Sequence, residues 1–168
     1  MEEIVLETVE LKKDFISPSG EIINVLKGID FTVKKGETIS IVGASGSGKT
    51  TFLHILGLLD KPTGGEVKYF GNSLNKLKDN QLSDFRNKNI GFIFQMHYLL
   101  PEFNAIENAI MPLIIRGVEF SEAKEKAINL FEKLNLSHRL YHKPGQLSGG
   151  EQQKVSLIRA FIGEPKII

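Results

Sequence analysis

The feature that most constrains the fold is the run Gly43-Ala44-Ser45-Gly46-Ser47-Gly48-Lys49-Thr50. It matches the pattern G-x-x-x-x-G-K-[ST] of a phosphate-binding loop. Residues 38–42 before it are mostly apolar and predict a short strand buried on both faces, whereas residues 50–59 predict a buried helix. A chance glycine-rich turn is the alternative, and the strand and helix predicted on either side argue against it.

In such a loop the glycines allow backbone N–H groups to surround a phosphate at the positive end of the following helix. Lys49 can then reach the β- and γ-phosphates of a nucleotide, and the Thr50 hydroxyl can bind Mg²⁺. The sequence therefore predicts a nucleotide site over residues 43–50.

The remaining pattern alternates between strands and helices. β-Branched and aliphatic residues predict strands in the first forty residues, with a turn at residues 17–20 between them. Later apolar periodicity predicts further helices, with Asp79 and Ser121 as helix caps. This order predicts an α/β fold, a P-loop NTPase core with an N-terminal antiparallel β layer. The predicted strands are residues 4–11, 22–33, 38–42, 66–70, 90–94 and the beginning of one at 166–168, and the later helices are 82–88, 121–134 and 151–162.

A second anion site is predicted at residues 147–153, which read LSGGEQQ. Ser148 and Glu151 fit the capping box S-x-x-E and place a helix start at Gly149. Two glycines at a helix start leave backbone N–H groups accessible to a phosphate. A well-capped helix without a ligand is the alternative, and the phosphate-binding loop earlier in the chain favours the anion site.

Together these motifs resemble those of ABC transporter ATPases over essentially the whole chain. Residues 147–153 are similar to the family signature, and Gln95, after the predicted strand, is similar to the Q-loop glutamine. Residues 58–67 resemble the stretch that follows the P-loop helix. Phe15 occupies the place where the family often has an aromatic ring that stacks on adenine, and a role in the core is the alternative for Phe15.

The resemblance implies a mechanism with ATP and Mg²⁺ as cofactors. Two ATPase domains would meet head to tail, with ATP between the P-loop of one and the signature of the other. Gln95 would contact Mg²⁺ or the attacking water and couple the site to a membrane partner. The implied nucleotide-binding residues are Gly43, Ala44, Ser45, Gly46, Ser47, Gly48, Lys49, Thr50, Thr51 and Phe15; the metal-binding residues are Thr50 and Gln95; and the signature residues acting on the partner's ATP are Ser148, Gly149, Gly150 and Glu151.

Residues 95–108 and 111–113 are most similar to the lipoprotein-releasing branch of the family, with the macrolide-export and cell-division branches close to it. That branch implies a transport-coupled ATPase at the cytoplasmic face of a bacterial inner membrane, bound to transmembrane permease subunits. Residues 96–150 would form a helical subdomain that ends in the signature. His97 could be a metal ligand, but no second ligand has suitable spacing, so a packing or interface role is predicted.

The family pattern continues with an aspartate for Mg²⁺, a glutamate that polarises water and a switch histidine, and none of these follows the signature before Ile168. Glu164 precedes Pro165, and the four histidines match no switch position. We therefore expect a single, incomplete ATPase domain over residues 1–168, with no complete catalytic set and the C-terminal part of the sheet missing. We expect such a fragment to bind nucleotide weakly and to hydrolyse no measurable ATP.

Composition limits the other functions. The net charge of +1 provides no global field for nucleic acid, and the absence of cysteine excludes disulfides and thiolate metal sites. No apolar run reaches the ~18 residues of a membrane span. A truncated, non-hydrolysing nucleotide-binding protein and a soluble ABC ATPase acting on nucleic acid or ribosomes remain as alternatives. The near-neutral charge and the single P-loop argue against the second.

Overall fold

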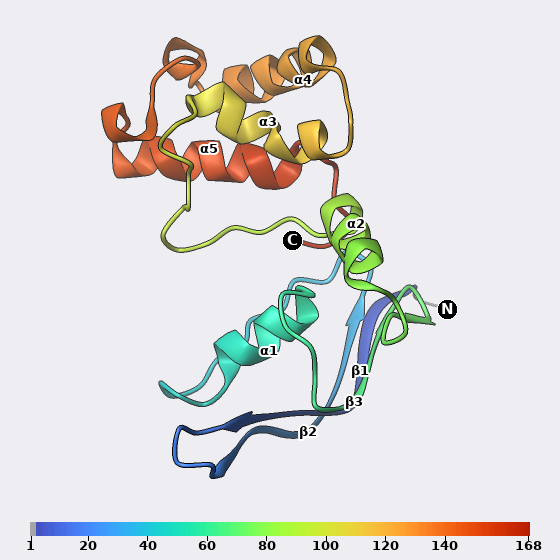
Figure 1. Cartoon of the computed structure of the whole chain (residues 1–168). Helices are drawn as coiled ribbons and strands as arrows, with labels where there is room; N and C mark the ends of the chain where they lie inside the picture. Colours follow the sequence, from blue (N-terminus) through green and yellow to red (C-terminus); the bar gives the residue numbers. More distant parts are fainter. Residues whose placement is uncertain (1–2) are drawn as a thin grey trace. The chain divides into compact units, whose positions relative to one another are not determined.

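The computed structural model describes residues 3–168, which divide into two compact units, one ending at Leu82 and the other Ser83–Ile168 (Figure 1). Each unit is described by itself. The first contains the sheet and the phosphate-binding loop, and the second contains the helices that lead to the signature.

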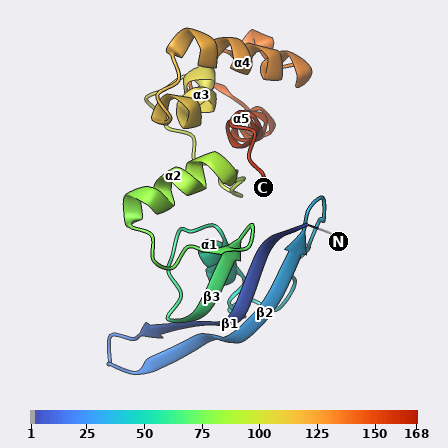
Figure 2. The ribbon, with the colours of Figure 1, turned by 90° about the vertical axis from the view of Figure 1, so that its right-hand side faces the viewer.

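The first unit is built on an antiparallel sheet with the strand order β2-β1-β3-β4 (Figure 2). The predicted hairpin is present, and it is longer than expected because β1 and β2 stay paired as far as Ile16 and Ile22. β3 pairs with the other edge of β1. The strands are β1 Ile4–Ile16, β2 Ile22–Lys34, β3 Gly64–Tyr69 and β4 Asn72–Ser73.

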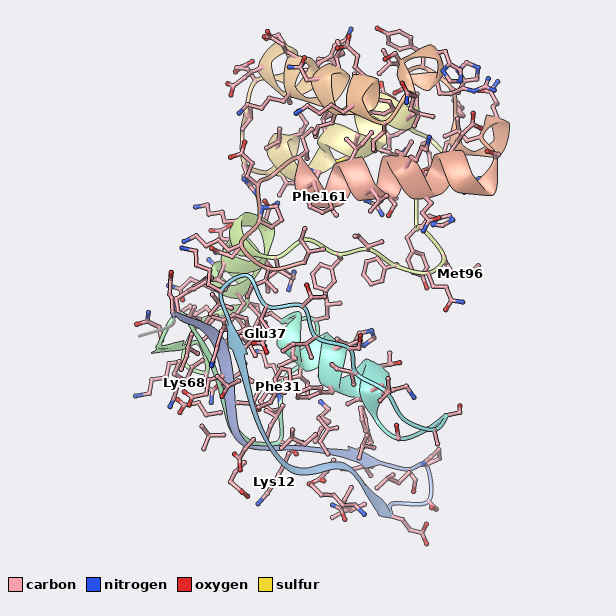
Figure 3. The ribbon with its side chains drawn as sticks, turned by 180° about the vertical axis from the view of Figure 1, so that it is seen from behind. Lys12, Phe31, Glu37, Lys68, Met96 and Phe161 are labelled. Atoms are coloured by element: carbon pink, nitrogen blue, oxygen red, sulfur yellow. The ribbon has the colours of Figure 1, made fainter. Side chains whose placement is uncertain are left out.

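Helix α1, Lys49–Leu56, packs against this sheet through one face only. The rings of Phe31 and Phe52 meet edge to face with centroids 5.4 Å apart. Phe31 is labelled in Figure 3. Phe52 and Ile55 are buried, whereas Leu53 is 51% exposed. The prediction of a helix after the loop is therefore confirmed. The prediction that it is buried all round and runs to residue 59 is wrong, because only one face meets the sheet and the helix ends before Gly57.

Two predicted strands do not form. Residues 38–42 have no ladder partner in the described part of the chain, and Val42 is 86% exposed. Residues 90–94 contribute only an isolated parallel bridge between Ile90 and Ile167, with Gly91 N donating to the Ile167 carbonyl at 2.8 Å. A strand exists only where another segment completes its hydrogen bonds, so these two predictions are wrong. The strand predicted to begin at residue 166 is represented by the same bridge.

The second unit is helical, and α3 lies between α4 and α5 (Figures 1 and 2). Its core collects apolar side chains of all three helices, including Ile110, Phe131 and Ile158. The helix predicted at residues 82–88 is longer, and Asp79, which was predicted as its cap, is instead its first helical residue. Helix α2, Asp79–Asn89, begins before Ser83 and continues into this unit. The later elements are α3 Ala105–Ile115, α4 Phe120–Lys133, η1 Ser137–Arg139, η2 Pro144–Gln146 and α5 Gly149–Phe161.

The predicted cap of α4 is wrong by two residues. Glu119 occupies the N-cap position without a side-chain hydrogen bond, so Ser121 lies inside the first turn. Ala123, Ala127 and Phe131 lie on the apolar face of this helix and are fully buried. None of the helices within residues 3–168 is long and apolar enough to cross a membrane.

Asn108, in α3, organises the turn that enters this helix. Its side chain is fully buried and accepts a hydrogen bond from Leu100 N at 2.7 Å. The amide nitrogen donates to the carbonyls of Leu100, Phe103 and Asn104, each at 3.0 Å. One side chain therefore bonds the amide and the carbonyl of Leu100 and the carbonyl of Phe103 in the turn before the helix.

We expect Asn108→Ala to lower the free energy of unfolding by about 2–4 kcal/mol, because the Leu100 amide and the Phe103 carbonyl lose the partner that this buried side chain provides. Urea unfolding followed by far-UV circular dichroism measures the change. Asn129→Ala, an exposed position on α4, is the control and should change stability by no more than about 0.5 kcal/mol. Equal effects of the two substitutions would contradict the assigned role.

Candidate nucleotide site and signature helix

The loop that precedes α1 takes a conformation that requires glycine. Gly43, Gly46 and Gly48 have φ angles of 156°, 77° and 88°. A Cβ atom at Gly43 would lie 2.9 Å from Ser47 Oγ, and one at Gly48 would lie 3.1 Å from the side chains of Val25 and Leu26. The spacing of the glycines in the sequence motif thus corresponds to the points where the backbone turns or passes close to other atoms.

The cation of the motif lies across the loop. Lys49 Nζ donates to the carbonyls of Gly43 at 2.9 Å and Ala44 at 2.7 Å. Helix α1 starts at Gly48 without a side-chain cap and has no acidic residue in its first turn. The start of this helix therefore combines uncapped N–H groups, a lysine ammonium and the Thr50 hydroxyl, which is a set of groups suited to an anion with a bound divalent cation.

Phe15 lies near the end of β1 and is 42% exposed, so the alternative of a core role for it is not supported. Lys13 Nζ lies 5.0 Å from the centroid of its ring. The same ammonium donates to Asp60 Oδ1 at 2.8 Å and to the carbonyl of Lys61 at 2.7 Å. Burial raises the pKa of Asp60, but hydrogen bonds from Lys13 and from the Lys61 amide outweigh it and leave the pKa below its usual value.

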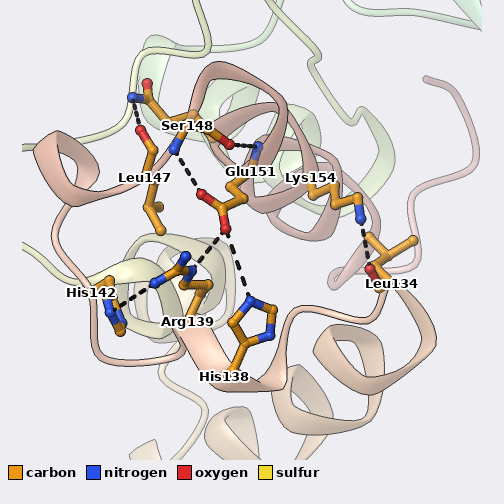
Figure 4. Close-up of polar contacts among 9 residues, drawn as sticks. Leu134, His138, Arg139, His142, Leu147, Ser148, Glu151 and Lys154 are labelled. Carbon is orange, nitrogen blue, oxygen red and sulfur yellow. Dashed lines mark hydrogen bonds and ion pairs between the residues drawn. The ribbon is translucent and has the colours of Figure 1, made fainter.

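The predicted capping box at the start of α5 is present (Figure 4). Ser148 Oγ accepts from Glu151 N at 3.3 Å, and Ser148 N donates to Glu151 Oε2 at 2.7 Å. A Cβ atom built at Gly149 or Gly150 would meet nothing within 4 Å, so the backbone there is open to solvent. Ser148, Gly149, Gly150 and Glu151 are thus brought together at one helix start.

Arg139, which no sequence motif indicated, completes this arrangement. Its Nε donates to Glu151 Oε1 at 2.8 Å, and its Nη1 lies 3.2 Å from His142 Nε2. His138 Nε2 lies 4.0 Å from the same carboxylate oxygen. Both oxygens of Glu151 are therefore engaged within the chain. Hydrogen bonds from the Ser148 backbone and from Arg139 lower the pKa of Glu151 to about 2.

Gln95 is exposed in the segment between Ile90 and α3 and is followed by Met96, which is 72% exposed. His97 Nδ1 is buried and has no hydrogen-bond partner among the described residues. Within residues 3–168 no group of three or more His, Cys, Asp or Glu side chains is placed to bind a metal ion. The packing or interface role of His97 stays a prediction.

The carboxylate of Glu151 should make the start of α5 sensitive to acid. Because its folded pKa of about 2 lies below the ordinary value of 4.5, the stabilisation is complete above pH 4.5 and is lost as the pH falls toward 2. We expect Arg139→Leu to move the titration midpoint of Glu151 upward, toward 4.5, because one of its hydrogen-bond donors is lost. Carboxyl carbon NMR titration measures the midpoint.

Lys126→Leu is the matched control, since Lys126 pairs with Glu122 on α4 at 2.9 Å. It removes the same charge and should leave the Glu151 midpoint in place. A midpoint that stays near 2 in Arg139→Leu would show that the guanidinium does not stabilise the charged carboxylate.

The sequence is similar to a known protein family and to individual curated proteins. The profile of the ABC transporter family matches residues 26–168. The lipoprotein-releasing system ATP-binding protein LolD of Geobacter metallireducens is 53% identical over 165 residues, which are 98% of this chain and 72% of the relative. LolD of Bacteroides thetaiotaomicron is 49% identical over 158 residues, 94% of this chain and 72% of the relative.

Solved structures confirm the predicted α/β ABC-ATPase fold. The dimeric structure of MJ0796, a bacterial ABC transporter cassette, superposes with a TM-score of 0.86 and 39% identity over 95% of this chain and 70% of that chain. A post-hydrolysis state of the same cassette bound to ADP and Pi gives the same TM-score and coverage. The chain belongs to the ABC transporter family, as one of its ATP-binding ATPase subunits.

Proposed function

We propose that this chain binds Mg²⁺ and ATP at residues 43–51 and acts as the ATP-binding subunit of a lipoprotein-releasing transporter at a bacterial inner membrane. The observation that carries the proposal is the 53% identity to a LolD protein over 98% of the chain, together with the glycine-determined loop before α1. No feature of the site favours the nucleic-acid-directed alternative.

At the nucleotide, the backbone N–H groups of the loop and the first turn of α1 donate to the phosphates. Lys49 leaves the carbonyls of Gly43 and Ala44 and donates to the β- and γ-phosphates. Thr50, exposed in the first turn of α1, and Gln95 are the proposed ligands of Mg²⁺, which neutralises developing phosphate charge when bound. Phe15 offers an exposed ring to the adenine.

A second copy completes the site in this proposal. Ser148, Gly149 and Gly150 of one chain donate to the γ-phosphate of the ATP bound by the other. Glu151 does not contact this phosphate in the proposal, because its two carboxylate oxygens already accept hydrogen bonds from Ser148 N and Arg139. It fixes the turn from which the donors project, and Arg139 balances its charge against the approaching phosphate.

The membrane partner is proposed to be a pair of transmembrane permease subunits contacted at the segment after Gln95. The exposed apolar side chains of Met96 and Tyr98 support a protein contact there. The prediction that residues 96–150 form a helical subdomain is part of the same proposal, in which this subdomain transmits ATP binding to the membrane subunits.

We expect Lys49→Ala to weaken ATP binding by at least about tenfold, because charge-assisted hydrogen bonds to phosphate contribute about 1.5–3 kcal/mol. In cells that depend on this gene, lipoproteins should then accumulate in the inner membrane. Equilibrium binding of a fluorescent ATP analogue and membrane fractionation measure the two effects. Lys126→Ala, on the exposed face of α4, is the control and should resemble the wild type. Normal lipoprotein release by Lys49→Ala cells would refute the proposal.

The head-to-tail arrangement can be tested by disulfide cross-linking because the chain contains no cysteine. We expect the double variant Ser45→Cys/Ser148→Cys to form a covalent dimer on mild oxidation with ATP and EDTA, since each P-loop would face the partner's signature. Each single variant should give far less dimer, because like positions lie apart in that arrangement. Non-reducing electrophoresis measures the dimer, and its absence with ATP in the double variant would exclude this arrangement.

A further inference from the structure

The segment after Gln95 contains a conformation that its sequence does not favour. His97 and Tyr98 have φ angles of 57° and 46°, in the left-handed region that residues other than glycine seldom adopt. Two such residues in succession cost free energy and persist only where surrounding contacts impose them. The segment's own backbone contributes two contacts, from His97 N to the Phe94 carbonyl at 3.2 Å and from Tyr98 N to the Met96 carbonyl at 2.5 Å.

The contact that joins both strained residues to the rest of the unit comes from α5. Arg159 Nη2 donates to the His97 carbonyl at 2.5 Å, and Arg159 Nη1 donates to the Tyr98 carbonyl at 2.8 Å. The two terminal nitrogens of one planar guanidinium therefore bind two consecutive carbonyls. A lysine ammonium carries the same charge but lacks this geometry.

One further contact places the start of the same segment against α5, and two aromatic contacts lie within the segment. A Cβ atom at Gly91 would lie 2.6 Å from the Ala160 carbonyl, so the backbone passes close to the helix one residue after Arg159. The Tyr98 ring meets Phe94 edge to face at 5.3 Å, and Phe94 stacks on Phe92 at 5.5 Å. Figure 3 labels Met96 on this segment and Phe161 at the end of the helix.

We propose that Arg159 is a positioning residue that keeps the Gln95 segment in its active conformation and makes it move together with the signature helix α5. This inference rests on the proposed function, because it assumes that Gln95 acts at the ATP site. Arg159 touches neither nucleotide nor metal in this proposal. It acts through the carbonyls of His97 and Tyr98, a few residues after Gln95, and the phosphate-binding loop does not depend on it.

The first test is kinetic. It uses the full-length gene product assembled with its membrane subunits, because residues 1–168 alone are expected to hydrolyse no measurable ATP. We expect Arg159→Lys to lower kcat for ATP hydrolysis about tenfold or more, since small misplacements of an active-site group have effects of this size or larger. The Kd for ATP should stay within about twofold. Lys154→Met, which removes a hydrogen bond from α5 to the Leu134 carbonyl at 3.0 Å, is the matched control and should leave kcat nearly unchanged.

The second readout does not depend on hydrolysis. In Arg159→Lys the backbone amides of residues 97–99 should exchange with deuterium faster than in the wild type, whereas those of α4 should not change.

A third test uses the double variant His97→Gly/Tyr98→Gly, which adopts the turn without strain but holds it less firmly. Adding Arg159→Lys to this variant should lower kcat by much less than adding it to the wild type.

The outcomes separate this inference from the proposed function. A wild-type assembly that neither binds nor hydrolyses ATP would remove the proposed function, and faster exchange at residues 97–99 would still establish the positioning contact. The inference would be overturned if kcat of Arg159→Lys stayed within twofold of the wild type, or if amide exchange at residues 97–99 did not change. It would also be overturned if Arg159→Lys lowered kcat by the same factor in the double-glycine variant as in the wild type. A parallel rise in the Kd for ATP would do the same, because it would indicate general loss of structure.

Discussion

The structure of both candidate anion sites depends on one constraint: the first N–H groups of an α-helix have no partners within the helix. The chain meets this constraint differently at its two important helix starts. At α1 the chain enters through Gly48 in the left-handed region, and no side chain caps the helix. At α5 a capping box satisfies Glu151 N and Ser148 N while leaving the Gly149 and Gly150 backbone exposed. In the proposed function, the amides left uncapped at each start are the ones that donate to a phosphate.

Charge then distinguishes the two starts. The first turn of α1 has no acidic residue, and its lysine already lies across the loop. The first turn of α5 contains Glu151, whose negative charge would oppose a phosphate. Arg139 compensates by donating to that carboxylate, and the ion pair keeps the local charge near neutral. A carboxylate that stabilises the turn is thus compatible with an anion site, provided that the guanidinium from η1 remains in place.

How much the sequence predicts depends on the range of the interactions involved. The P-loop glycines and the Ser148–Glu151 capping box are local, since all their partners lie within a few residues, and both were predicted correctly. The strands at residues 38–42 and 90–94 were predicted from apolar content, but a strand also needs a partner from elsewhere in the chain, which composition does not reveal. Ser121 was predicted as the N-cap of α4, but Glu119 occupies that position. Helix boundaries read from sequence are commonly off by a residue or two.

The residues that sequence reasoning missed share a long-range geometry. Lys13 reaches Asp60, Arg139 reaches Glu151 and Arg159 reaches His97 and Tyr98, and no motif links the members of these sets. Each is a cation that binds oxygen atoms on a loop or at a helix start, and Arg139 and Arg159 do so at or near a predicted site residue. The motif residues are the proposed donors to phosphate, and Arg139 and Arg159 bind groups at or near them. A substitution at such a cation would therefore change the site without altering any residue of a recognisable motif.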